Sequence, residues 1–157
     1  MAITLQYTSK GSEQWAKEVV KLAQSNLIRG NKATPGTLMR SVSYTIDPRT
    51  LQIDFYYEDY GDYVQWGRKK GDKMPPIAPI AKWAKQRGIP RFRDKKGRYI
   101  SNESRAFILA KSIAIKGIKP FPFFDDAIET SITKLEKKLE EGLGRDLEDQ
   151  FDNILEA

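Results

Sequence analysis

The chain has 157 residues and a formal net charge of +6, with 39% hydrophobic and 31% charged residues, which is ordinary for one soluble globular domain. Because it contains no histidine and no cysteine, its composition excludes Ser-His triads, thiol nucleophiles, disulfides and cysteine-based zinc sites. No apolar run approaches the roughly 18 residues needed to span a bilayer, and the N-terminus lacks a secretory signal, so we expect folding in the cytoplasm.

The first predicted element is a helix from Ser12 to Arg29. Trp15 and Val19 recur on it at helical spacing. Ser12 suits its N-cap, and Gly30 suits a left-handed C-cap. The following NKATPG segment is a loop by composition.

Two strands are expected next, after a brief helical turn at Thr37 to Arg40. They run from Val42 to Ile46 and from Leu51 to Tyr57, and both alternate β-branched or aromatic residues with polar ones. The intervening DPRT places Asp and Pro where a type I turn prefers them. These features predict an antiparallel hairpin.

The middle of the chain is predicted to hold two helices between basic, turn-rich loops. A short helical turn ends at Gly67, and a basic loop follows from Arg68 to Lys73. The helices are expected from Ile77 to Arg87 and from Ser101 or Asn102 to about Lys116. Between them, Pro90 to Tyr99 is predicted to form a basic, mobile hairpin.

The C-terminal part is predicted to be an extended KPFPFF connector and then a long helix from Asp125 to about Leu155. Gly142 and Gly144 each weaken a helix by roughly 1 kcal/mol relative to alanine, which predicts a kink or a break. A narrow apolar stripe follows the helix, and it could pack on its own domain or on a neighbour. The stripe consists of Ile128, Ile132, Leu135, Leu139, Leu143, Leu147, Phe151 and Ile154.

Charge is unevenly distributed along the chain. From Asp125 to the C-terminus there are eleven acidic and four basic residues, so the preceding part is strongly basic. This pattern is compatible with nucleic-acid contact by the basic part, with neutralisation between the two ends, or with an ordinary solvated surface. The acidic helix itself argues against DNA as its partner.

Four carboxylates, Asp54, Glu58, Asp59 and Asp62, cluster at the end of a predicted strand, which superficially suits a Mg²⁺ site. Their spacing matches no metal-binding signature, and their tyrosine-rich surroundings are equally typical of an interface. A metal-dependent nuclease is the enzymatic hypothesis that remains. We nevertheless expect no enzymatic activity, cofactor or metal.

Two basic loops are candidates for contact with the DNA backbone, without sequence readout, or for ordinary solvated loops. Their cations are Arg68, Lys69, Lys70, Lys73, Arg91, Arg93, Lys95, Lys96 and Arg98. Tyrosine and tryptophan are also dense between Tyr56 and Trp66, a composition found at protein interfaces.

Three motifs in order resemble the tail-completion proteins of tailed bacteriophages, the neck or minor tail proteins of the head-to-tail joining region. They are GTLMRS at Gly36 to Ser41, YGDYVQWG at Tyr60 to Gly67, and KPFPFFDDAI at Lys119 to Ile128. The chain departs from this family in having Gln65 where an acidic residue is usual. The segment from Ile77 to Ile115 is also longer than in the simplest members.

The resemblance implies a single α+β domain over residues 1–157, with a small, mostly antiparallel sheet and flanking helices. Residues 77–116 would be a helical insertion and residues 125–157 the C-terminal helix. Copies would dock laterally into a ring, commonly of six, at the head-tail junction of the virion after assembly in the host cytoplasm. The interface residues implied are Tyr60, Tyr63, Val64, Trp66, Gly67, Pro120, Phe121, Phe123 and Phe124.

In such a ring the partners would be other copies of the chain and the neighbouring connector and tail proteins. The basic loops would face packaged DNA, through non-specific backbone contacts, or an acidic neighbouring ring. The alternative function is a basic nucleic-acid-binding module without enzymatic activity.

Overall fold

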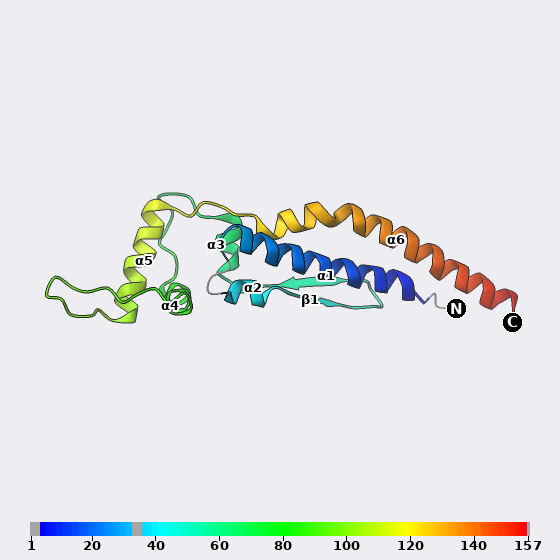
Figure 1. Cartoon of the computed structure of the whole chain (residues 1–157), viewed down its shortest axis with the longest axis horizontal. Coiled ribbons are helices and arrows are strands. Elements are labelled where there is room, and N and C mark those ends of the chain that lie inside the picture. The colour runs from blue at the N-terminus through cyan, green and yellow to red at the C-terminus, as the bar shows by residue number, and fades with distance from the viewer. Residues whose placement is uncertain (1–3, 33–35, 157) are drawn as a thin grey trace.

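The computed structural model describes residues 4–32 and 36–156 and shows an α+β fold with flanking helices, as expected (Figure 1). The two strands, β1 (Ser43–Ile46) and β2 (Ile53–Tyr56), form one antiparallel hairpin. The helices are α1 (Gln6–Arg29), α2 (Thr37–Ser41), α3 (Gly61–Trp66), α4 (Ile77–Gln86), α5 (Asn102–Lys116) and α6 (Phe123–Leu155).

The molecule is elongated and has two parts (Figure 1). In the larger part, the body, α1 and α6 lie side by side in opposite directions, together with the hairpin, and the C-terminal end of α6 extends past the start of α1. In the smaller part, the lobe, α4 and α5 pack together. Because the lobe is inserted between α3 and α6, two chain segments connect it to the body.

The hairpin confirms the predicted strands and buries one face. Tyr44 pairs with Phe55 and Ile46 with Ile53 in the antiparallel register, and these four side chains are half-buried while their neighbours are exposed. The Phe55 ring meets the Trp15 ring of α1 edge-on, with centroids 6.0 Å apart. Alternation along the strands therefore places the hairpin on the helix pair.

The main core lies where α1, α2, the hairpin and the start of α6 meet. Trp15 is anchored there by its indole N–H, which donates to the backbone oxygen and the hydroxyl of Ser131, each at 3.0 Å. The buried apolar residues of this core are Trp15, Val19, Ala23, Leu27, Leu38, Val42, Phe123 and Ala127. The lobe has a separate small core of Ile80, Ala106 and Ala110.

α1 starts at Gln6, earlier than the predicted Ser12, and a residue of α6 caps its first turn. Ser12 is not the N-cap: it lies buried inside the helix and donates its hydroxyl to the Thr8 carbonyl. The carboxylate of buried Asp146 accepts from the Tyr7 and Thr8 N–H groups, each at 2.9 Å, and from the Thr8 hydroxyl at 2.6 Å. A side chain 138 residues away thus satisfies the first turn of α1.

These hydrogen bonds also determine the ionisation of Asp146. Burial by itself raises the pKa of this carboxyl, but the bonds from the Thr8 hydroxyl and from the backbone of Tyr7, Thr8 and Gln6 outweigh it. The net effect is a pKa below the ordinary value of an aspartate. The charged form, which is the better cap for a helix N-terminus, is therefore favoured.

Of the predicted kink or break at Gly142 and Gly144, the break is wrong, since α6 runs unbroken from Phe123 to Leu155. Gly142 is buried against α1, where an added Cβ would lie 2.7 Å from the Thr8 Cα atom. Across the same contact, a Cβ on Gly11 would lie 3.2 Å from the Lys138 carbonyl oxygen. The two glycines allow the helix backbones to approach closely.

The face of α6 that packs on α1 is consequently not the predicted apolar stripe. Its fully buried members after Phe123 are small or polar: Ala127, Ser131, Gly142 and Asp146. Leu135 and Leu139 of the stripe are half-buried, whereas the members from Leu143 onward are exposed. The first part of the stripe therefore packs partly within this chain, and the part from Leu143 onward is exposed to solvent.

The lobe confirms the local signals read from the sequence. Ser101 caps α5 by accepting from the Ser104 N–H at 3.1 Å, and Gly117 ends the helix. Residues 90–100 form the predicted basic hairpin, with Arg93 paired to Tyr99 in an antiparallel bridge. Among the described residues, no helix is long and apolar enough to cross a membrane.

We predict that Gly142→Ala lowers the free energy of unfolding by about 1–3 kcal/mol, because the added methyl group must push α1 and α6 apart. Gly144→Ala is the matched control: a Cβ there meets nothing within 4 Å, and alanine should stabilise the helix by about 1 kcal/mol. Urea unfolding of both variants measures the two changes. If both substitutions stabilise the protein, the close contact at Gly142 is contradicted.

Candidate functional site

Two of the sequence motifs lie against each other where the body meets the lobe. The end of α3 runs beside the connector that leads to α6, and the Phe121 N–H donates to the Val64 carbonyl at 2.8 Å. Arg68 and Ile118 exchange two backbone hydrogen bonds, each of 2.9 Å. We call this paired region, residues 61–68 with 117–124, the neck. It contains both predicted contact segments.

Gln65 joins the neck to the start of α6. Its side chain is only 1% exposed, and its Oε1 atom accepts from the Phe124 N–H at 3.0 Å. This bond satisfies an N–H of the first helical turn, and it requires only an acceptor oxygen. The side-chain amide of Gln65 is therefore sufficient for this role. The Gln65 Nε2 atom is buried and has no hydrogen-bond partner among the described residues.

Glycines permit the two segments of the neck to pair. Gly67 has φ 67° and ψ −166°, and Gly117 has φ 74° and ψ −179°, a conformation essentially confined to glycine. A Cβ on Gly67 would lie 2.4 Å from the Ile118 carbonyl oxygen, and one on Gly117 would lie 2.6 Å from the Arg68 carbonyl oxygen. A side chain is therefore excluded at both positions for two reasons: the backbone angles favour glycine, and the facing carbonyl oxygen leaves no space for a Cβ.

The predicted interface residues divide into core and surface. Phe123 must be removed from the interface set, because its side chain is 0% exposed and belongs to the core. Tyr60, Tyr63, Val64, Phe121 and Phe124 are half-buried, with Phe124 stacked edge-on against Phe55 at 5.2 Å. Trp66 is 64% exposed, and Pro120 is also exposed.

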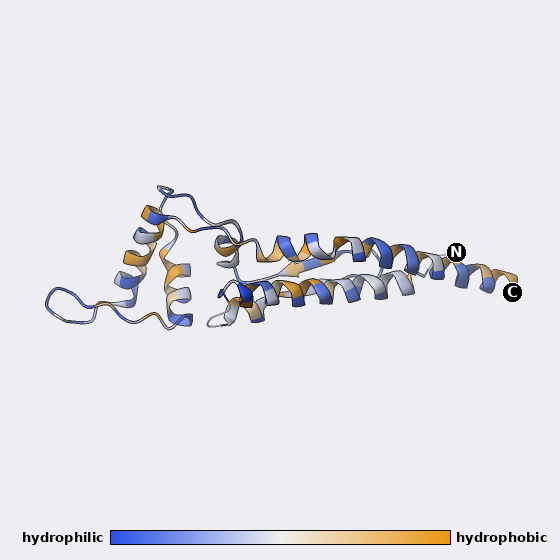
Figure 2. Cartoon of the chain, turned by 45° about the horizontal axis from the view of Figure 1, so that its top comes forward, coloured by the Kyte–Doolittle hydropathy of each residue, from blue (hydrophilic) through white to orange (hydrophobic). Residues whose placement is uncertain are grey.

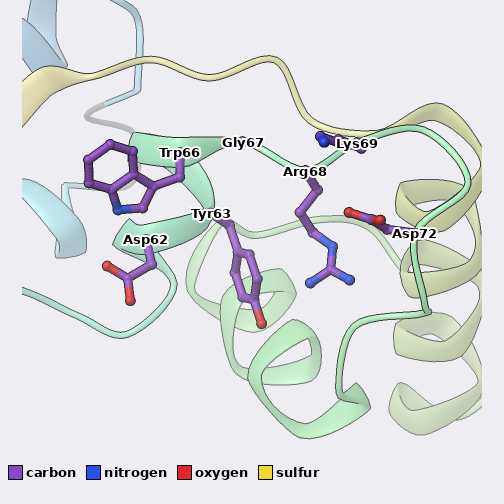
Figure 3. Close-up of a pocket in the computed structure, with 7 residues that line it drawn as sticks. All are labelled: Asp62, Tyr63, Trp66, Gly67, Arg68, Lys69 and Asp72. Carbon is purple, nitrogen blue, oxygen red and sulfur yellow. The ribbon is translucent and has the colours of Figure 1, made fainter.

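A shallow hollow of about 540 Å³ lies in front of the neck (Figure 3). Its walls are Asp62, Tyr63, Trp66, Gly67, Arg68, Lys69 and Asp72. The Arg68 guanidinium lies over the Tyr63 ring, 5.2 Å from its centroid, and donates to the Lys73 carbonyl. The hollow is rimmed by charges of both signs beside an exposed indole, which suits protein contact.

A second, narrower cavity of about 190 Å³ lies between α3 and the lobe, and we call it the α3–α4 groove. Its floor is aromatic and aliphatic, formed by Tyr60, Tyr63, Val64, Ile80, Trp83, Ile113 and Ile118. Three cations also line it, Lys32, Arg87 and Lys119. Burial raises the pKa of the Tyr60 phenol, so this hydroxyl stays neutral at physiological pH.

Three members of the predicted basic set are engaged within the chain. Arg68 is engaged in the neck, Arg93 donates to the Tyr99 hydroxyl at 2.8 Å, and Arg98 pairs with Asp94 at 3.0 Å. These three arginines stabilise the loops in which they lie. The cations that remain exposed without an ion pair among the described residues are Lys69, Lys70, Lys73, Arg91, Lys95 and Lys96.

The candidate carboxylates do not converge on one point. Glu58 pairs with Lys82 at 3.1 Å, Asp54 accepts from the Gln52 side chain, and Asp62 accepts from the Tyr57 hydroxyl at 2.9 Å. Burial and then the Asp62 carboxylate raise the pKa of Tyr57 to about 12. Within residues 4–32 and 36–156, no group of three acidic side chains is arranged to hold a metal ion.

The sequence did not reveal the α3–α4 groove or the role of Asp146. The groove combines residues from four separate stretches of the chain, between Lys32 and Lys119, and no local pattern links them. Asp146 resembles every other acidic residue of α6 until α1 is placed beside it.

Comparison of the chain with protein-family models, curated proteins and solved structures found no match.

We predict that Gly67→Ala destabilises the protein by several kcal/mol, because strain of about 1–3 kcal/mol in the backbone adds to the collision with Ile118. Gly71→Ala is the matched control, since Gly71 also has a positive φ of 86° but an added Cβ meets nothing within 4 Å. Thermal unfolding followed by circular dichroism compares them. Equal losses in the two variants would show that the close pairing of the neck is not present.

Proposed function

We propose that this chain is a structural, non-enzymatic virion protein of a tailed bacteriophage. In this proposal, copies dock laterally into a ring at the head-tail junction or tail-completion site. The ring would contact neighbouring connector or tail proteins. The three ordered motifs support the phage assignment, and the exposed apolar surface of α6 supports assembly.

The observation that carries the assembly role is the uncovered end of α6. Figure 2 shows hydrophobic segments continuing along α6 to its C-terminal end, beyond the body. Leu147, Phe151 and Ile154 there are 37%, 63% and 55% exposed. Apolar side chains gathered on a surface mark interaction sites more often than they mark a solvated monomer.

The neck brings together two of the three segments on which the proposal rests. The YGDYVQWG and KPFPFF segments, far apart in the sequence, bond to each other through Val64 and Gln65, and the Arg68–Ile118 pair continues this pairing just outside them. They position the hollow beside Trp66 and the α3–α4 groove on the outer surface. Such surfaces, built from half-buried aromatic residues with charges around them, suit protein partners.

The alternative, a nucleic-acid-binding module, is favoured by one observation. The exposed cations occur in two loops, at residues 68–73 and 91–98. Non-specific binding to the phosphate backbone needs only such cations. Because three of the arginines are engaged within their own loops, we rank this function second. In a ring the same loops would face packaged DNA or an acidic neighbour.

We predict that the purified chain forms concentration-dependent oligomers and co-purifies with tailed particles when it is produced together with their other structural proteins. Light scattering measures the mass in solution, and mass spectrometry of purified particles measures incorporation. A monomer at every concentration that is also absent from particles would rule the proposal out. Submicromolar DNA binding with a steep salt dependence would favour the alternative.

A further inference from the structure

We infer that the end of α6, residues 147–156, docks into the α3–α4 groove of a neighbouring copy of this chain. The inference rests on the proposed assembly and names the contact that would build it. Three properties of the described residues carry it: unmatched apolar surface on both sides, opposite charge, and the distance between the two sites in one chain.

The apolar side chains of the α6 end lie on one face. Leu147, Phe151 and Ile154 are separated by four and three residues, the spacing that aligns side chains along a helix. α1 begins at Gln6, and its first turn is opposite Asp146. The exposure of the three side chains shows that the described part of the chain leaves this face largely uncovered.

The α3–α4 groove has the size and lining to receive side chains from such a face. Its volume of about 190 Å³ is below the roughly 300–1,000 Å³ typical of small-molecule pockets. An aromatic floor that includes Tyr63 and Trp83 suits one or two apolar side chains. Phe151, the most exposed of the three, would be the main anchor.

The charges on the two surfaces are opposite. The α6 end carries Glu148, Asp149, Asp152 and Glu156 and has no basic residue. The groove is lined by Lys32, Arg87 and Lys119, none of which forms an ion pair with the described residues. Complementary charge around an apolar centre favours this pairing and fixes its orientation.

The same charges disfavour the simplest alternative, in which two α6 ends pair symmetrically. Such a dimer would bring four acidic residues from each copy together with no cation on either helix end. Like charges placed across an interface oppose association. The groove offers apolar contact without this repulsion.

The groove that receives the α6 end must belong to another copy. α6 starts beside α3, where the Phe124 N–H bonds to Gln65. At about 1.5 Å per residue, Phe151 lies roughly 40 Å along the helix from that point. The contact is therefore head-to-tail, and repeating it generates a ring when the rotation closes.

Cross-linking tests the docking directly, because the chain contains no native cysteine. Gln150→Cys lies beside the apolar face and Lys119→Cys at the groove. Both leave Leu147, Phe151 and Ile154 intact, and Lys119→Cys keeps two of the three groove cations, Lys32 and Arg87. A short bis-maleimide should link the two variants when they are mixed. Adding Phe151→Asp to the first variant should reduce the yield about tenfold or more.

Two controls make the result decisive. Gln150→Cys alone should give little dimer, and Gln150→Cys mixed with Lys21→Cys, an exposed site on α1, should give no more. If Gln150→Cys links mainly to itself, the ends pair symmetrically and the inference is overturned. A yield with Lys119→Cys no higher than with Lys21→Cys overturns it as well.

Charge reversal provides an independent measurement. Glu148→Lys with Asp152→Lys should weaken oligomers, as should Lys32→Glu with Lys119→Glu, and combining all four in one chain should restore them. Failure of the combination to recover would contradict the docking.

The two proposals fail in different ways. Oligomers without the Gln150–Lys119 link would overturn the docking and leave the assembly role intact. A link formed by a chain that never joins tailed particles would overturn the phage role alone.

Discussion

The close approach of α1 and α6 is the constraint on which the rest of the structure depends. It is possible because Gly142 and Gly11 present no side chain to the opposite backbone, and it is fixed by the Asp146 carboxylate, which accepts two N–H groups and a hydroxyl from the start of α1. Since Asp146 is bound at the first turn of α1, the register between the helices is determined. The hairpin then packs on the pair through Phe55.

This register leaves a part of α6 without a partner in the same chain. The face of α6 that is buried against α1 carries small side chains, so the larger apolar side chains lie to one side of the contact. α1 begins opposite Asp146 and therefore does not cover the last turns of α6, from Leu147 to Leu155. At the opposite end of the body, the neck positions the lobe against α3 and creates the α3–α4 groove. The packing of α6 on α1 thus separates the apolar end of α6 from the groove by most of the length of that helix.

Several local features of this fold could be predicted from the sequence, although Gly30 is not the left-handed C-cap expected of it, and long-range features could not. Ser101, Gly117 and the alternating strands act on their immediate neighbours, so their residue types suffice. Ser12 had the chemistry of an N-cap, but Asp146 performs that role from 138 residues away. The apolar stripe of α6 did not predict the face that packs on α1, for a related reason. That contact is made by Ala127, Ser131 and Gly142, whose small side chains give no amphipathic signal. Two of the motif segments lie in the neck, but the sequence did not show that Val64 and Gln65 join them.

Amide hydrogen exchange along α6 tests the central claim most directly, namely that α1 covers this helix as far as Asp146 and a partner covers the remainder. In dilute protein, amides from Phe123 to Asp146 should be protected and those from Leu147 to Leu155 should exchange rapidly. In the assembled state, the second group should become protected as well. Equal protection of both groups in dilute protein, or rapid exchange of the second group after assembly, would contradict the account.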